Sequence, residues 1–197
     1  MIPIPNAGLY FCIAFAITLV ATWLINRQSK FFFTKDPLRR KFSILEMEFP
    51  AKSFELENLI NGIYLLPDEA QKTVKAVKNQ LLLDYFLFIP ATYGGIYILC
   101  MHVAANLQTT VGSYWFVGLA WAQLISFLLD YIENTYFWIM IGRQNIPIPK
   151  PDPEKPEVIS ASFKMMQILE AFKWGLALIG IVCCTSVMAY FWLSGNF

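Results

Sequence analysis

Two carboxylates interrupt an apolar run in the stretch LLDYIENTYFW, residues 128–138. Asp130 and Glu133 are three residues apart, and Asn134 follows Asp130 by four, so a helix would carry all three side chains on one face. Charged side chains at membrane depth usually face a bundle interior or an aqueous cavity and pair with one another. This spacing predicts a polar site inside a helical membrane protein.

Four apolar runs are long enough to cross a bilayer, which takes about 20 helical residues. Of the 197 residues, 57% are hydrophobic and 15% are charged, whereas soluble domains carry about 25% charged residues. We therefore expect an all-α polytopic membrane protein, folded as a single membrane domain over residues 1–197. The four transmembrane helices are predicted at about 7–25, 81–105, 111–141 and 160–192, with a cytoplasmic amphipathic segment between the first two.

The basic residues indicate which way the spans run. Ten Lys and Arg residues lie between Arg27 and Lys78, and the other five lie between Arg143 and Lys173. Cytoplasmic loops concentrate Lys and Arg. We therefore expect the loops 26–80 and 142–159 on the cytoplasmic side and both ends of the chain outside.

This topology brings charged residues from three helices to a similar depth. Span two begins near Asp84 on the cytoplasmic side, span three ends there soon after Glu133, and the apolar part of span four begins after Lys173. Glu170 and Lys173 are three residues apart and share a face. We expect a polar cluster inside the bundle, with Glu170 as a secondary member and Lys173 as the leading counter-ion, formed by Asp84, Asp130, Glu133, Asn134 and Lys173.

The charge of this cluster limits what it could bind. Three carboxylates against one lysine leave an excess of two negative charges if all ionise. Like charges and desolvation both disfavour full ionisation, so the cluster predicts binding of a proton, a cation or a lipid headgroup, in a protein that takes part in transport. The alternative is a structural network that fixes helix register, since polar contacts between membrane helices contribute about 0.6–2 kcal/mol each.

Catalytic and cofactor motifs are missing from the sequence. There is one histidine, His102, and no Gly-x-Ser-x-Gly, glycine-rich phosphate loop or His-Glu-x-x-His. The four cysteines lie in apolar runs without a Cys-x-x-Cys spacing. We expect no metal, no cofactor and no enzymatic activity, and a carboxylate-dependent enzyme that modifies lipids is the weakest alternative.

The expected partners follow from the same distribution. The lipid bilayer surrounds the spans, and the small, uncharged outer face also suits a non-catalytic accessory or scaffold subunit of a larger membrane complex, or self-association. Nucleic-acid binding is not expected, because the basic residues flank the spans and are explained by topology.

The loop 26–80 contains several local patterns. KFFFTKDPLRRKF (30–42) joins aromatic and basic residues, which predicts a segment at the membrane surface; anchoring the end of span one is the alternative. SILEMEF (43–49) alternates apolar and acidic residues and predicts a short strand. One helical face is predicted from Phe54, Leu59, Ile60, Ile63 and Tyr64.

Prolines mark two further features. A helix that starts after Pro67 is expected to continue into span two and to bend near Pro90, which cannot donate a backbone hydrogen bond. IPIPKPDPEKPE (146–157) has a proline at every second or third position and predicts an extended tether.

Three stretches resemble an uncharacterised family of small four-span prokaryotic integral membrane proteins: LLLDYFLFIPATYGGIYILC (81–100), AWAQLISFLLDYIENTYFWIMI (120–141) and AFKWGLALIGI (171–181). The family pattern has Leu-Asp-Phe-x-Phe opening span two, Asp-x-x-Glu-Asn in span three and Lys opening span four. The chain departs from the pattern at Tyr85, where the family has Phe, and in the proline-rich loop. The resemblance implies a prokaryotic cytoplasmic membrane and the same polar set, and it implies no activity.

Overall fold

Long helices dominate the computed structural model, which describes residues 4–35, 38–50, 53–143 and 161–193. Four helical segments are long and apolar enough to cross a membrane: Ala7–Phe31, Ala70–Asn106, Thr110–Ile141 and Gln167–Leu193. The predicted all-α fold with four candidate spans is therefore confirmed. The proline-rich stretch 146–157 lies outside the described residues.

The chain divides into two compact units. The span unit, as we call the first, comprises Met1–Thr22, Tyr85–Tyr131 and Ala171–Phe197. The loop unit comprises Trp23–Asp84 and Ile132–Glu170. Each unit has its own buried core, and each is described below by itself.

The span unit packs four helical segments against one another. These are the first part of α1 (Ala7–Gln28), α5 (Ile89–Asn106), most of α6 (Thr110–Ile141) and the second part of α7 (Ala161–Leu193). Its core includes Tyr93, Ile96, Cys100, Ala120 and Cys184. Small residues allow close approach: a Cβ on Gly95 would lie 3.2 Å from the Cβ of Ala14, the kind of contact that joins helices in membranes.

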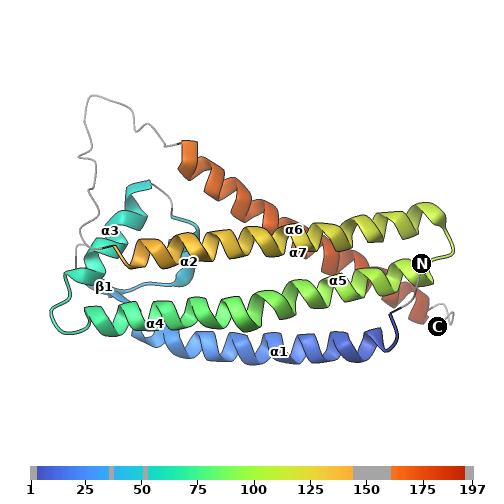
Figure 1. Ribbon diagram of the computed structural model, residues 1–197, viewed down its shortest axis with the longest axis horizontal. Helices are drawn as coiled ribbons and strands as arrows, with labels where there is room; N and C mark the ends of the chain where they lie inside the picture. Colours follow the sequence, from blue (N-terminus) through green and yellow to red (C-terminus); the bar gives the residue numbers. More distant parts are fainter. Residues whose placement is uncertain (1–3, 36–37, 51–52, 144–160, 194–197) are drawn as a thin grey trace. The chain divides into compact units, whose positions relative to one another are not determined.

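The loop unit contains the short elements. After the 3₁₀ turn η1 (Ser29–Phe31), the antiparallel strands β1 (Phe33–Lys35) and β2 (Arg39–Lys41) pair in the register Phe33↔Lys41, and the helices α2 (Ile44–Glu48), α3 (Ser53–Tyr64) and α4 (Ala70–Leu83) follow. β1 lies against α3 (Figure 1). Gly62 is required there, because a Cβ would clash with the Thr34 hydroxyl and the Lys35 carbonyl.

Aromatic and aliphatic side chains fill the core of the loop unit. The rings of Phe32 and Phe42 stack with centroids 5.1 Å apart. The predicted apolar face of α3 is buried at Leu59, Ile60 and Ile63. Within the segment 30–42, expected at a membrane surface, β1 and β2 thus pair, and the flanking Phe32 and Phe42 are buried in a protein core.

The strand predicted for residues 43–49 is wrong, because this stretch forms the helix α2. Its start is fixed by a capping box, in which the Glu46 carboxylate accepts a hydrogen bond of 3.0 Å from the backbone N–H of Ser43. The Ser-x-x-Glu spacing is the sequence signature of this cap. The same carboxylate pairs with Arg40 at 2.6 Å.

Span two runs as one helical segment from Ala70 to Asn106, as expected, with a π-helical turn, η2 (Asp84–Phe88), just before Pro90. In an i to i+5 pattern the carbonyl of Tyr85 would accept from residue 90, which as proline has no N–H. The Tyr131 hydroxyl donates to this carbonyl at 2.7 Å, and the Tyr85 hydroxyl donates to the Tyr131 carbonyl at 2.9 Å. Two reciprocal hydrogen bonds therefore join η2 to α6.

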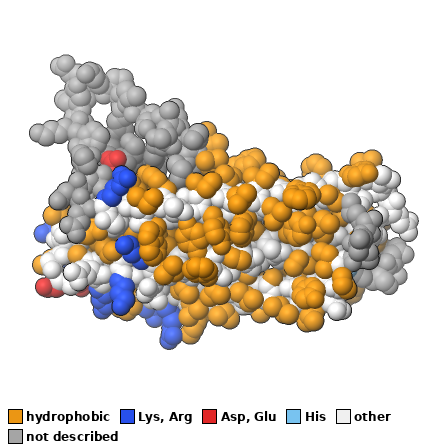
Figure 2. Space-filling model, viewed as in Figure 1, with side chains coloured by type: hydrophobic (Ala, Val, Ile, Leu, Met, Phe, Trp, Pro, Cys, Tyr) orange, Lys and Arg blue, Asp and Glu red, His pale blue; other side chains and the backbone are white. Residues whose placement is uncertain are grey.

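Hydrophobic side chains cover most of the visible helical surface in Figure 2, and the visible Lys and Arg side chains lie over the loop unit. Large apolar side chains are exposed along every span, for example Phe15, Trp121 and Leu178 at 53%, 60% and 63%. Water would disfavour this surface and lipid favours it. The protein is therefore membrane-embedded.

Candidate functional site

An ion pair is buried in the core of the span unit. The Lys173 ammonium on α7 lies 2.8 Å from Oδ1 of Asp130 on α6. The Tyr93 hydroxyl on α5 donates to Oδ2 of the same carboxylate at 2.9 Å. Lys173, Asp130 and Tyr93 are only 2%, 5% and 1% exposed. Three helices thus meet at one carboxylate, and both of its oxygens accept a hydrogen bond.

The electrostatics of this triad are balanced. One ammonium and one carboxylate sum to zero charge, and the neutral Tyr93 hydroxyl adds a donor. Desolvating two charges is costly, and the attraction between them offsets that cost only with short, well-aligned contacts. The triad has such contacts, at 2.8 and 2.9 Å from the two carboxylate oxygens.

A second polar pair lies in the loop unit. The Asn134 amide on α6 donates to Oδ2 of Asp84, the first residue of η2, at 2.9 Å. Asn134 is buried and Asp84 is half-buried. A π-helical turn often occurs at a functional position. The position of Asp84 in η2 therefore supports it as a site residue, in addition to its charge.

The structure brings the predicted site residues together in two pairs. Asp130 and Lys173 meet in the span unit, and Asp84 and Asn134 meet in the loop unit. The other two predicted residues belong to the loop unit, where Glu133 on α6 is 7% exposed and Glu170 on α7 is 2% exposed. All six predicted residues are thus at least half-buried.

Sequence reasoning missed three polar residues of the span unit. Tyr93 is one, and Gln123 and Ser126 on α6 are the others, both fully buried. Gln123 and Ser126 precede Asp130 by seven and four residues, which places them on its face of the helix. Their spacing from Asp130 is the sequence signal that could have identified Gln123 and Ser126. They were not predicted because an uncharged side chain does not stand out in an apolar run as a charged one does.

Gln123 and Ser126 carry unsatisfied polar atoms. The Gln123 amide donates to the Leu176 carbonyl at 3.0 Å, yet within the described residues its Oε1 and the Ser126 Oγ are buried without a hydrogen-bond partner. Other hydroxyls in the spans differ: Thr18 and Thr185 donate to carbonyls four residues earlier on their own helices, at 3.0 and 2.7 Å. An ordered water is the usual partner for such buried atoms.

The side chains that could hold a metal are scattered. Across the described ranges, no group of three or more His, Cys, Asp or Glu side chains is gathered as a metal site would require. Cys100 and Cys184 are in contact, with 3.3 Å between their sulfurs, but they are two thiols in the core of the span unit.

No family model, curated protein or solved structure matches this chain. The fold and the site define the class by themselves. The chain is an all-α polytopic membrane protein with four candidate spans and a buried Asp–Lys ion pair.

Proposed function

We propose that this protein binds and releases a proton at Asp130 as part of transport across its membrane. The observation that carries the proposal is the closed geometry of the triad. Both carboxylate oxygens already accept a donor, at 2.8 Å from Lys173 and 2.9 Å from Tyr93. A cation or a lipid headgroup needs room beside these two donors, whereas a proton binds at one of the remaining lone pairs of the carboxylate and needs almost no additional space.

The polar face of α6 supports the same proposal. Ser126 lies one helical turn from Asp130, and Gln123 lies a further turn away. Their unsatisfied oxygen atoms suit a bound water that would connect the carboxylate with a polar path along the helix. Intramembrane acidic residues that exchange protons are commonly part of such chains.

The orientation is part of the proposal. The Lys and Arg distribution supports loops 26–80 and 142–159 on the cytoplasmic side, and the resemblance to the four-span prokaryotic family supports a prokaryotic cytoplasmic membrane. Asp130 would then lie in the inner part of its span.

Proton flux into sealed vesicles tests the proposal. The protein is reconstituted into liposomes that contain a pH-sensitive dye, and a potassium diffusion potential drives proton entry. We expect the wild-type protein to acidify the lumen and Asp130→Asn to abolish the flux. Tyr190→Phe, at an exposed tyrosine of α7, is the matched control and should conduct like the wild type.

The structural alternative gives a different result. If wild-type liposomes acidify no faster than protein-free ones, and Asp130→Asn lowers only the melting temperature, the ion pair fixes helix packing and transports nothing. Equal flux in the wild type and in Asp130→Asn would likewise refute a role for this carboxylate.

A further inference from the structure

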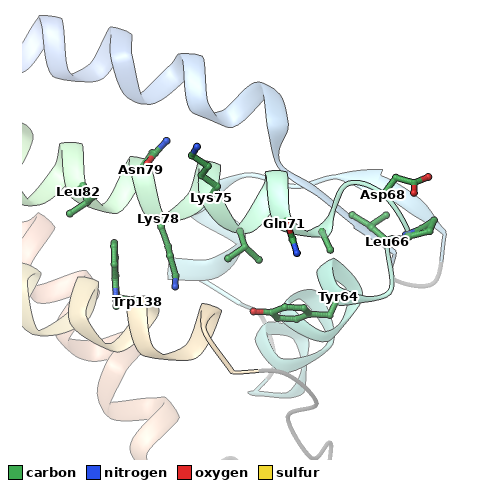
Figure 3. Close-up of a pocket in the computed structure, with 12 residues that line it drawn as sticks. Tyr64, Leu66, Asp68, Gln71, Lys75, Lys78, Asn79, Leu82 and Trp138 are labelled. Atoms are coloured by element: carbon green, nitrogen blue, oxygen red, sulfur yellow. The ribbon is translucent and has the colours of Figure 1, made fainter.

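A pocket of about 1000 Å³ opens in the loop unit and is separate from the ion pair. Its walls come from α4, from Trp138 on α6, and from Tyr64 at the end of α3. Figure 3 shows Lys78 directed toward Trp138, with Lys75 and Asn79 extending to the opposite side of α4 in this view. Polar, cationic and aromatic groups thus share one cavity.

The lining changes character along α4. Gln71, Lys75 and Lys78 form the polar part, and Leu82, which is 40% exposed, lies one turn further along, where the apolar run of span two begins. On α6, the Trp138 ring lies 5.2 Å from the Lys78 ammonium. Tryptophan is enriched where a membrane meets water. The pocket therefore has a basic part and an apolar part, arranged as they are in a phospholipid.

The charge of the pocket is positive. Lys75 and Lys78 are three residues apart on α4, and Asp68 is the one acidic side chain in the described lining. Their side chains diverge in Figure 3, so contact with a single ligand requires the Lys75 side chain to turn toward Lys78, which its flexible four-carbon stem allows. A phosphate group has the charge and the acceptors that two ammonium groups require.

Contacts at the end of α6 fix one wall of the pocket. The Tyr64 hydroxyl donates to the Ile141 carbonyl at 2.7 Å, one of the carbonyls that a helix end leaves unpaired. Burial raises the pKa of Tyr64, so this hydroxyl remains a donor at neutral pH. The Lys78 ammonium lies next to Gly142, at 3.9 Å from where a Cβ would stand. The wall is formed before any ligand arrives, which lowers the cost of binding.

We propose that this pocket binds the phosphate headgroup of an anionic phospholipid. Lys75 and Lys78 contact the phosphate, Gln71 and Asn79 offer hydrogen bonds to the headgroup, and an acyl chain passes Leu82 and Trp138. A free phosphate ion has the same anionic group as the lipid headgroup, but the apolar end of the pocket favours the lipid. The proposal does not depend on proton transfer at Asp130.

Native mass spectrometry of the purified chain tests the proposal. The detergent-solubilised protein is titrated with phosphatidylglycerol, with phosphatidylcholine and with inorganic phosphate. We expect preferential retention of phosphatidylglycerol. Lys75→Gln and Lys78→Gln should each weaken that binding roughly fivefold, because a lysine near an anionic headgroup contributes about 1 kcal/mol.

Lys72→Gln is the matched control. Lys72 also lies on α4, but its ammonium lies over the Phe31 ring at 4.4 Å, and it does not line the pocket. The Lys72→Gln variant should bind phosphatidylglycerol like the wild type. Lys75→Gln leaves the contacts at the end of α6 in place, so a loss of lipid in this variant cannot be attributed to disruption of that wall.

Three results would overturn the proposal. Equal weakening by Lys72→Gln would indicate general attraction between a basic surface and anionic lipid. Equal retention of phosphatidylcholine would show that charge plays no part. Saturation by inorganic phosphate at the same concentration would assign the pocket to a free anion instead of a lipid.

Discussion

Asp130 is the residue on which three helices of the span unit converge, and its contacts decide what the ion pair contributes. Removing one member of a buried pair leaves the other charge desolvated and uncompensated, which typically costs about 3–5 kcal/mol. Removing both members can be nearly neutral. Tyr93 would partly compensate for the loss of Lys173, since its hydroxyl still donates to the carboxylate at 2.9 Å.

We therefore predict strong coupling between the two charges. Lys173→Met should lower the free energy of unfolding by about 3–5 kcal/mol, and the double variant Asp130→Asn/Lys173→Met should lose clearly less than the sum of the single variants. Thermal unfolding in detergent measures all four proteins of the cycle. Glu46→Gln, which breaks the exposed Arg40–Glu46 pair, is the control and should cost at most about 1 kcal/mol. Strict additivity of the two single effects would contradict coupling.

At the scale of the element, the π-helical turn η2 compensates for Pro90. The proline removes a donor in the middle of a long helix, and the hydroxyl of Tyr131 on another helix donates to the nearby Tyr85 carbonyl. The rings of Tyr85 and Tyr131 meet edge to face with centroids 4.7 Å apart, a favoured aromatic geometry. Two hydrogen bonds and one ring contact therefore fix α6 against η2.

Removing each hydroxyl should give unequal effects. Tyr131→Phe removes the hydroxyl that donates to the Tyr85 carbonyl beside Pro90 and should cost about 1–3 kcal/mol, whereas Tyr85→Phe should cost about 1 kcal/mol, because the Tyr131 carbonyl lies within the regular helix α6. Pro90→Ala restores a backbone N–H and should reduce the cost of Tyr131→Phe. Thermal unfolding of the single and double variants measures this, and an undiminished cost in the Pro90→Ala background would refute the compensation.

Local sequence rules predicted some elements of the loop unit and missed others. The apolar face of α3 was readable because Leu59, Ile60 and Ile63 recur at helical spacing. The strand prediction for residues 43–49 was wrong because it was based on the alternation of apolar and acidic residues. The Ser-x-x-Glu spacing instead forms a capping box, which starts the five-residue helix α2. The pairing of β1 with β2 depends on burial of Phe32 and Phe42 beneath α3, and such a tertiary contact has no local signature.

At the scale of the whole molecule, hydropathy alone predicted four spans, because a bilayer requires long apolar helices whatever their packing. The polar site was harder to predict. Helical spacing identified the face that carries Asp130, but the choice of Asp130 as the partner of Lys173 depends on how α7 packs in the span unit. Uncharged polar side chains are common in membrane helices, so the sequence did not predict the buried Tyr93, Gln123 and Ser126.

The orientation of the chain leads to the last prediction. If the basic segments face the cytoplasm, a cysteine introduced at Leu38, which is 78% exposed between β1 and β2, should react with a membrane-impermeant maleimide only in inside-out vesicles. Gln108→Cys, in the exposed link between α5 and α6, should react only in right-side-out vesicles. The unmodified chain is the control, because its four cysteines lie within the spans and should stay unlabelled. If both introduced cysteines react from the same side, the chain does not cross the membrane an odd number of times between Leu38 and Gln108. If each reacts only in the opposite vesicle type from the one expected, Lys and Arg do not set the orientation of this protein.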